Sequence, residues 1–257
     1  MNASTRRVCI VTGSSSGIGA ATARLFARNG FDIVVNYSRN PAPAEVVSEQ
    51  CRALGAQVLT IQANIADDAQ CRELAAQVQD RWGRADVLVN NAGTTKFVAA
   101  ADLDGLSATD FQDIYAVNVI GAWQMTRACV PLLRQGERPG VVNVSSIASM
   151  MGRGSSIAYM ASKGALNAMT FGLAKALGPT IRVNAVAPGF IESPWLRQGL
   201  GEANYAKARQ TYCEKSVLGD VMTPEDIAEA IWWLGAGAAK TTGEVMLVDA
   251  GLGLGRS

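Results

Sequence analysis

Short runs rich in valine and isoleucine alternate with longer helical segments along all 257 residues of the chain. Strands that follow one another with helices between them form a parallel sheet, because each helix returns the chain to the same edge. Strand-like runs are found at residues 7–12, 32–36, 57–62, 87–90, 140–145, 181–187 and 245–248. Helical segments lie at residues 18–29, 42–54, 67–82, 109–133, 159–177 and 224–234. The alternation predicts an α/β fold with one doubly wound, seven-stranded parallel sheet and helices on both faces.

The bulk composition excludes several classes of protein. Hydrophobic residues make up 49% of the chain, and the 23 basic and 22 acidic residues form no long run of one sign. A nucleic-acid partner or a membrane surface would usually require a basic stripe. No uncharged apolar segment reaches the roughly 18 residues of a membrane span. The polar residues 1–7 do not resemble a signal peptide, so we expect a cytoplasmic protein with one domain over residues 1–257.

The chain contains no histidine, which excludes histidine-based catalytic triads and most transition-metal sites. We therefore expect no metal site. The cysteines are odd in number, widely spaced and without a C-x-x-C pair, so no disulfide framework is predicted: Cys9, Cys51, Cys71, Cys129 and Cys213. Acid–base chemistry in this chain must use tyrosine, lysine, aspartate, glutamate or cysteine.

Glycines with the spacing G-x-x-x-G-x-G follow the first strand-like run and precede the first helix. Gly13 can form the tight turn, Gly17 admits a pyrophosphate close to the backbone, and Gly19 allows the helix to pack near the strand. Glycine-rich turns also close ordinary strand–helix units. At this junction the spacing predicts a dinucleotide site that includes Ser15, Ser16 and Ile18.

The end of the second strand bears on the choice of dinucleotide. NAD-binding proteins often place a carboxylate there for the adenosine ribose, whereas this chain has Asn36, Tyr37, Ser38 and Arg39. An absent acid and a nearby arginine suit a 2′-phosphate. We therefore predict that NADP(H) is preferred, with NAD(H) possible; the alternative is that Arg39 is a solvated loop residue.

Polar residues and glycine also follow other strands, at the edge where ligands of parallel sheets bind. The predicted cofactor contacts are Ala63, Asn64 and Ile65 after the third strand, and Asn91, Ala92 and Gly93 after the fourth. Asn118 interrupts an apolar helix, so it is either a surface residue or a functional kink. After the fifth strand, the hydroxyl of Ser145 or Ser146 could donate to a substrate carbonyl.

Tyr159 and Lys163 are four residues apart in a helical segment, so their side chains lie on one face about one turn apart. An ammonium near a phenol favours the phenolate and lowers its pKa from about 10. The pair predicts a proton donor and acceptor. An exposed lysine beside a half-buried tyrosine is the alternative if the pair stands alone.

Together these motifs resemble the short-chain dehydrogenase/reductase family over residues 7 to about 251, and the family has a single-domain Rossmann fold that binds NAD(P). The resemblance rests on the glycine loop, Asn90-Asn91-Ala92-Gly93, Asn118, Ser146, the pair of Tyr159 and Lys163, and Pro188-Gly189. It implies that Tyr159 is the catalytic acid/base, that Lys163 lowers its pKa and holds the nicotinamide ribose, and that Ser146 polarises the substrate. Asn118 would position a proton-relay water.

The resemblance also assigns nicotinamide contacts to Pro188, Gly189, Ile191 and Ser193, with Ser193 where a threonine is usual. Two residues depart from the family pattern. Asn64 stands where aspartate is common near the adenine. Ser16 stands where NADP-preferring members often have a basic residue, so Arg39 is the main argument for NADP.

The resemblance implies an NAD(P)-dependent oxidoreductase that acts on a small carbonyl or secondary alcohol, such as a 3-oxoacyl-[acyl-carrier-protein] reductase. A sugar or other alcohol dehydrogenase, or a dinucleotide-binding sensor without catalysis, are the alternatives. Residues 190–218 resemble a substrate lid, whose Trp195, Tyr205 and Tyr212 either bind an apolar substrate or pack the lid itself. A homotetramer is expected, because relatives pair the helices at 109–133 and 159–177 between subunits.

Overall fold

The structure, a computed structural model, describes residues 6–255; residues 1–5 and 256–257, which include most of the polar N-terminal segment considered above, lie outside the described part. All seven strands pair in parallel in one sheet with the order β3-β2-β1-β4-β5-β6-β7. The strands are β1 (Arg7–Val11), β2 (Phe31–Tyr37), β3 (Val58–Gln62), β4 (Val87–Asn90), β5 (Gly140–Val144), β6 (Arg182–Pro188) and β7 (Val245–Val248). The predicted fold class is confirmed.

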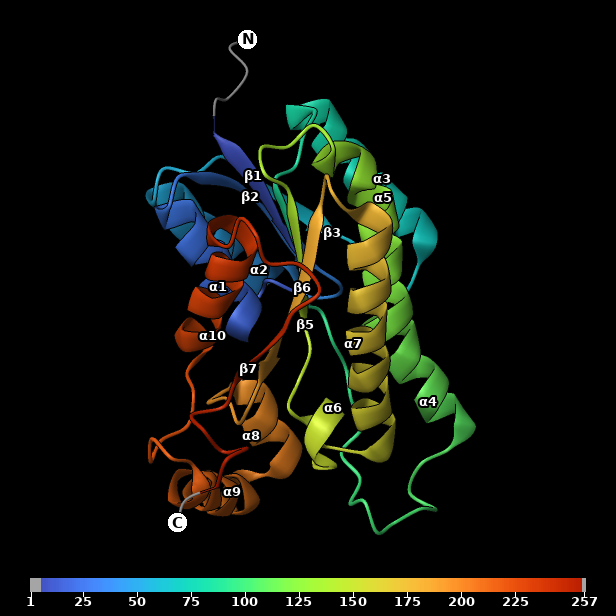
Figure 1. Cartoon of the computed structure of the whole chain (residues 1–257), viewed down its shortest axis with the longest axis vertical. Helices are drawn as coiled ribbons and strands as arrows, with labels where there is room; N and C mark the ends of the chain where they lie inside the picture. The colour runs from blue at the N-terminus through green and yellow to red at the C-terminus, as the bar shows by residue number, and fades with distance from the viewer. Residues whose placement is uncertain (1–5, 256–257) are drawn as a thin grey trace.

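Helices cover both faces of the sheet (Figure 1). One face packs against α1 (Gly17–Arg28), α2 (Pro41–Ala53) and α10 (Pro224–Trp232), which continues as the π-helical turn η2 (Trp233–Gly237). The other face packs against α3 (Asp68–Trp82), α5 (Ala122–Leu133) and α7 (Ile157–Leu177). Each face has its own buried apolar cluster, which explains why the central strands are apolar along their whole length.

The chain order reverses at the centre of the sheet, because β1 pairs with β2 on one side and with β4 on the other. The helices that follow β1 and β4 therefore leave to opposite faces, and a crevice opens between the carboxyl ends of these two strands. The glycine loop after β1 and the segment after β4 border this crevice. The fold therefore places the predicted dinucleotide loop at the position where parallel sheets bind ligands.

The long helix expected at residues 109–133 is divided into three segments: α4 (Ala108–Tyr115), the π-helical turn η1 (Ala116–Gly121) and α5. Ser107 starts α4 with a capping box that it shares with Asp110. The wider turn begins two residues before Asn118, whose side chain bonds outside the helix. Of the two alternatives for Asn118, the kink is therefore the correct one.

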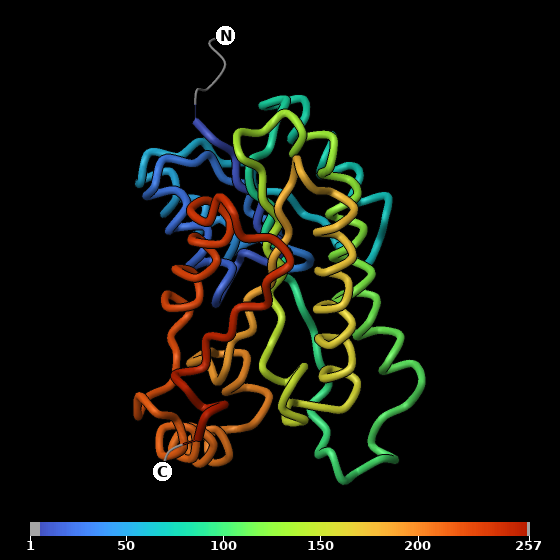
Figure 2. Tube along the Cα trace, viewed as in Figure 1, coloured from blue at the N-terminus to red at the C-terminus, as the bar shows by residue number. Residues whose placement is uncertain are grey.

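Three helices were not predicted from the sequence: α6 (Ala148–Met151), α8 (Pro194–Leu200) and α9 (Glu202–Lys215). The last two make up most of the 190–218 segment and lie below the carboxyl ends of the strands (Figure 1). Toward its C-terminus the chain returns to the end of this segment, where the Leu218 N–H donates to the Ala250 carbonyl at 3.1 Å. Figure 2 traces this return along the Cα path. In residues 6–255 no helix is both long and apolar enough to cross a membrane.

Candidate active site

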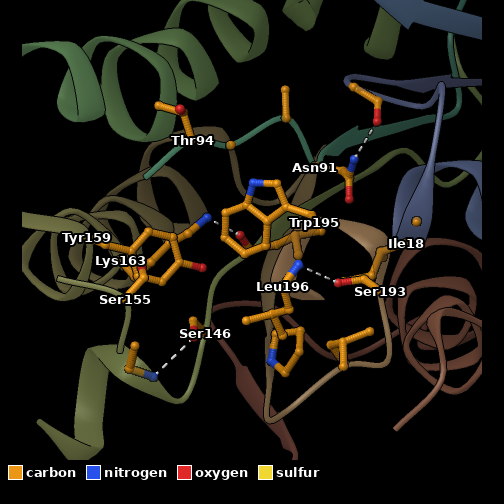
Figure 3. A pocket seen from close by; sticks show the side chains of 18 of the residues that line it. Ile18, Asn91, Thr94, Ser146, Ser155, Tyr159, Lys163, Ser193, Trp195 and Leu196 are labelled. Carbon is orange, nitrogen blue, oxygen red and sulfur yellow. Dashed lines mark hydrogen bonds between the residues drawn. The ribbon is translucent and has the colours of Figure 1, made fainter. Parts of the chain in front are cut away.

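A cavity of about 700 Å³ opens at the carboxyl ends of the strands. It is bordered by the loops that follow β1 to β6, by the start of α7 and by the two lid helices. Figure 3 shows side chains from these elements converging on it, with Tyr159 and Lys163 on one side and Ile18 and Ser193 on another. One continuous space therefore joins the predicted dinucleotide loop to the predicted acid/base.

The glycine loop packs tightly against the segment after β4. Gly13 has a φ of +59°, and a Cβ on it would lie 2.9 Å from the Ala92 Cα. A Cβ on Gly19 would lie 2.6 Å from the Gly13 carbonyl oxygen and 2.5 Å from the Asn91 amide nitrogen. Any side chain at either position would separate the two loops. Gly13 and Gly19 therefore act through packing, as their predicted roles required.

The N-terminus of α1 has uncapped N–H groups that can bind an anion. Ser16 occupies the N-cap position, but its side chain accepts no hydrogen bond from the first turn. In contrast, Ser156 and Ser107 use their hydroxyls to cap α7 and α4. Ser16, Gly17 and Ile18 line the cavity, so the uncapped N–H groups of this helix end are available to a phosphate there. The residues present fit a dinucleotide.

At the end of β2 the side chain of Asn36 is not available to a ribose. Asn36 is 1% exposed; its carbonyl oxygen accepts from the Gly13 N–H at 3.0 Å and its amide donates to the Ala63 carbonyl at 3.0 Å. It therefore braces the glycine loop against β3, while Asn36 itself lies in the cavity lining as a predicted cofactor residue. Ser38 and Arg39 are the next residues that line the cavity, and both are exposed.

Asn91 ties β4 to the glycine loop, since its amide donates to the carbonyls of Thr12 at 2.9 Å and Gly13 at 3.0 Å. Asn64 lines the cavity after β3, and its side chain accepts from the Ala66 N–H at 3.2 Å. The remaining predicted residues of these two segments also line the cavity: Ala63, Ile65, Ala92 and Gly93.

Asn118 links the loop after β4 to α7. Its carbonyl oxygen accepts from the Thr94 N–H at 2.8 Å, and its amide donates to the Thr94 carbonyl and to the Ser162 hydroxyl, both at 3.0 Å. The Ser162 hydroxyl in turn donates to the Tyr159 carbonyl at 2.7 Å. Asn118 is 1% exposed and stands behind Gly93 rather than in the cavity lining. Its side chain therefore positions the turn that carries Tyr159.

Tyr159 lies in the first turn of α7, where its N–H donates to the hydroxyl of the N-cap residue Ser156. Lys163 lies one turn later and is almost completely buried. Its ammonium donates to the Val144 carbonyl at 2.8 Å and lies 5.6 Å from the centre of the Tyr159 ring. Figure 3 shows the two side chains adjacent at one wall of the cavity. The exposed-lysine alternative is therefore wrong.

The proton affinities of this pair differ from the expectation. Burial raises the pKa of Tyr159 to about 12, and a hydrogen bond with Ser146 acts in the opposite direction. Burial lowers the pKa of Lys163 to about 8. The predicted lowering of the tyrosine pKa by Lys163 is therefore not found: desolvation dominates for both groups, since Lys163 is buried and Tyr159 is half-buried at the cavity wall.

Ser146 is held by a chain of partly buried hydrogen bonds that begins on α7. The Asn167 amide donates to the Ser149 hydroxyl at 2.9 Å, and that hydroxyl donates to the Ser146 carbonyl at 2.6 Å. Ser145, the other candidate, donates its hydroxyl to Asn167 at 2.6 Å and is buried. Ser145 is therefore part of the support, and Ser146 is the serine whose hydroxyl interacts with Tyr159.

The lid supplies an aromatic wall above Tyr159. The Trp195 ring on α8 lies 6.3 Å from the Tyr159 ring and 5.6 Å from the Phe97 ring. Trp195 and Tyr212 line the cavity, whereas Tyr205 is buried against Phe190 and belongs to the packing of the lid. Tyr212 also packs within the lid, since its ring lies 4.9 Å from the Phe190 ring. Packing therefore holds for Tyr205 and Tyr212, and substrate binding by Trp195 or Tyr212 stays a prediction.

Comparisons with known proteins agree with this geometry. The model of a protein family described as "Enoyl-(Acyl carrier protein) reductase" matches residues 13–253. The chain belongs to the short-chain dehydrogenase/reductase family. A protein of Streptomyces violaceoruber assigned as ketoacyl reductase 2 of the granaticin polyketide synthase is 42% identical over 245 residues, which are 95% of each chain.

Two further relatives support the assignment to the short-chain dehydrogenases/reductases. The 3-oxoacyl-[acyl-carrier-protein] reductase FabG of Thermotoga maritima is 37% identical over 96% of this chain and 97% of its own. A crystal structure described as a short-chain dehydrogenase/reductase of Burkholderia xenovorans superposes with a TM-score of 0.91 at 42% identity, covering 98% of this chain and 100% of the other. The chain is an NAD(P)-dependent oxidoreductase of this family.

The cavity of this short-chain dehydrogenase/reductase gathers most of the residues predicted from its sequence, including Pro188, Gly189, Ile191 and Ser193. Within residues 6–255, four predicted residues are outside the lining: Ser15, Gly19, Tyr37 and Asn118. The hydroxyl of Ser193 caps α8 by accepting from the Leu196 N–H at 3.2 Å (Figure 3). Sequence reasoning missed Phe97 and Arg153, which lie in irregular loops without a repeating pattern.

Proposed function

We propose that this short-chain dehydrogenase/reductase uses NADP(H) to reduce the ketone of a 3-oxoacyl-type substrate, with Tyr159 as the proton donor. One observation carries the proposal: Tyr159, Ser146 and Lys163 line the same cavity as the uncapped N-terminus of α1. The bound nicotinamide would supply the hydride. All other parts of the reaction would then be carried out by side chains of this chain.

The phenol of Tyr159 is protonated at neutral pH, because its pKa is about 12. It can therefore donate a hydrogen bond to a substrate oxygen and pass on its proton as negative charge develops there. Ser146 would hold the same oxygen from a second direction. The ammonium of Lys163 would stabilise the tyrosinate that remains, and Asn118 would keep the catalytic turn in place through Ser162.

The substrate class is supported by the lid and by the relatives. Phe97, Trp195, Leu196 and Leu200 give the substrate side an apolar and aromatic wall. Such a wall suits an acyl chain better than a sugar, whose hydroxyl groups need more polar partners. The names of the Streptomyces and Thermotoga relatives, a ketoacyl reductase and a 3-oxoacyl-[acyl-carrier-protein] reductase, agree with this choice.

The preference for NADP(H) is supported by the cation at the end of β2. Arg39 lines the cavity there beside Ser38, and no carboxylate lines the cavity within the described residues. An arginine can bind a 2′-phosphate with two parallel hydrogen bonds. An aspartate or glutamate, which would repel that phosphate and select NAD(H), is absent from the same described lining.

The remaining features of the proposal are a single catalytic domain over 1–257, a lid at 190–218, a homotetramer and a cytoplasmic location. Large apolar side chains are exposed on η1, α5 and α7, where a partner subunit would cover them: Ile120, Trp123 and Phe171. The five cysteines are free thiols, which suits the reducing cytoplasm.

The direct test is the consumption of NADPH with a neutral 3-oxoacyl thioester, followed at the nicotinamide absorbance. We expect turnover that is faster with NADPH than with NADH, and no turnover with rhamnose or glucose and NADP⁺. Turnover of sugars in preference to ketones would support the sugar dehydrogenase alternative. Tight dinucleotide binding without turnover across a broad set of ketones and alcohols would support the sensor.

A further inference from the structure

Arg153 is a cation of the cavity that the proposed reaction does not explain. Within the described residues three cationic side chains line the cavity, Arg39, Arg153 and Lys163, and no carboxylate does. Arg39 follows β2 at the proposed adenosine end, and Lys163 lies beside Tyr159. Arg153 lies in the loop between α6 and α7, next to the lid, where no part of a dinucleotide is expected.

The backbone beside Arg153 lies against the catalytic tyrosine. A Cβ built on Gly154 would be 3.7 Å from a ring carbon of Tyr159 and 3.0 Å from the Cβ of Ala148. Neighbouring Cα atoms are about 3.8 Å apart, so Arg153 begins only one residue away from this contact. Arg153 therefore lines the cavity one residue away from the backbone that contacts the Tyr159 ring.

In the described part of the chain, the guanidinium of Arg153 has no carboxylate partner. Among the ion pairs within residues 6–255, none includes Arg153. The positive charge of Arg153 lowers the pKa of Tyr212, a residue of α9 that also lines the cavity, while burial raises that pKa more strongly. An exposed arginine that faces a cavity without a carboxylate can form charge-assisted hydrogen bonds with an anion from solution.

We propose that Arg153 binds an anionic group of the substrate, so that the preferred ketone carries a carboxylate or a phosphate on the part that lies under the lid. This inference rests on the proposed ketone reduction and adds the chemical class of the substrate to it. The apolar wall of Phe97 and Trp195 would pack against the carbon chain between the two groups. Arg153 would then act on substrate binding and not on the proton transfer.

Two matched pairs of ketones test the proposal and distinguish the two anions. The carboxylate pair is 5-oxohexanoate and its methyl ester. The phosphate pair is acetoacetyl-coenzyme A and the neutral thioester of acetoacetate with N-acetylcysteamine. For Arg153→Gln we expect kcat/KM to fall on the order of tenfold to a hundredfold for the anionic member of one pair, and to stay within about twofold for its neutral member. The pair that shows this loss identifies the anion.

Two further variants serve as controls. Lys207→Gln removes an exposed cation of α9 that does not line the cavity, and it should change neither pair. Arg153→Lys keeps the charge and should restore part of the selectivity for the anion. Equal effects of Arg153→Gln on the anionic and neutral members of both pairs, or no effect on any of them, would overturn the proposal.

A binding measurement separates this inference from the proposed function. Isothermal titration of the complex with NADP⁺ should give a dissociation constant for the anionic ketone that is about tenfold or more weaker in Arg153→Gln than in the wild type. If neither protein reduces any of the four ketones, the proposed function fails, and this binding difference still decides whether Arg153 recognises the anion. Equal affinities in the two proteins would end the inference even if turnover is seen.

Discussion

The ammonium of Lys163 donates a hydrogen bond to the Val144 carbonyl, 2.8 Å away, at the last residue of β5. The bond ties the second turn of α7 to the strand that leads directly into Ser145 and Ser146. The buried lysine thus fixes the distance between the helix that carries Tyr159 and the strand end that carries Ser146. We infer that Lys163 supports the geometry of the site as well as its electrostatics.

The burial of Lys163 predicts a pH dependence of stability. The pKa of Lys163 falls from its ordinary value of 10.5 to about 8 in the folded protein. Between these values the unfolded chain binds more protons than the folded one, so the free energy of unfolding contributed by this residue rises with pH. Relative to Lys163→Met, the wild type without cofactor should gain about 2 kcal/mol between pH 7 and pH 9.5.

Urea unfolding of the two proteins at several pH values measures this gain. The titration of Tyr159, whose pKa is raised to about 12, is common to both proteins and cancels in the difference. Parallel curves of unfolding free energy against pH would mean that Lys163 is not desolvated as described.

The chain of hydrogen bonds behind Ser146 predicts a positioning role for Asn167. Asn167→Ala breaks its bonds with Ser145 and Ser149 and releases the Ser146 turn. We expect kcat to fall about tenfold while the KM for NADPH is unchanged, since the cofactor end of the cavity is not touched. Steady-state kinetics with a saturating ketone measures the two parameters separately.

Thr170→Val is the matched control on the same helix. Thr170 accepts a buried hydrogen bond from Asn143 at 2.9 Å, and this bond does not lead to Ser146. Its loss should lower the unfolding free energy by about 1–3 kcal/mol and leave kcat within about twofold. A similar fall of kcat in both variants would show that Asn167 acts through general stability.

Arg39 should determine the choice between the two dinucleotides. Arg39→Gln removes the proposed partner of the 2′-phosphate, so the KM for NADPH should rise on the order of tenfold to a hundredfold. The KM for NADH should stay within about twofold, because NADH lacks that phosphate. Arg28→Gln, at the far end of α1, removes an exposed arginine outside the cavity lining and should change neither value. An equal loss for both cofactors in Arg39→Gln would contradict the assignment.

The fold and the core of the site could be predicted because they depend on periodic or fixed spacing. Alternating strands and helices determined the sheet, and the four-residue separation of Tyr159 and Lys163 placed both at one wall of the cavity. The glycine loop was predicted for the same reason, since Gly13 and Gly19 are needed where two backbones approach closely.

Other features could not be predicted because they depend on contacts between distant segments. The sequence placed Asn36 among the cofactor contacts, but it did not reveal that its amide donates to the carbonyls of Ile61 in β3 and of Ala63 just after it. The pKa values of Tyr159 and Lys163 depend on burial by the whole domain, which their spacing does not reveal. No sequence pattern indicated Arg153, because its electrostatic effect on Tyr212 depends on the folded lid.

The exposed apolar side chains of α5 and α7 predict the behaviour of the proposed tetramer. Phe171 of α7 is 50% exposed, and Asp at this position would place a charge in the subunit contact. Phe171→Asp should therefore reduce the mass measured by light scattering at micromolar concentration from four chains to two or one. Val46→Asp, on α2 and equally exposed at 54%, should leave the mass unchanged. A monomeric wild type at that concentration would refute the tetramer.

The most direct test of the proposed chemistry is Tyr159→Phe, which removes one oxygen atom and keeps the ring that packs near Trp195. Binding of NADPH, measured by titration, should stay within about threefold of the wild type, while kcat/KM for ketone reduction should fall by a factor of about 10²–10⁴. Comparable ketone reduction by Tyr159→Phe and the wild type would contradict the assignment of Tyr159 as the proton donor.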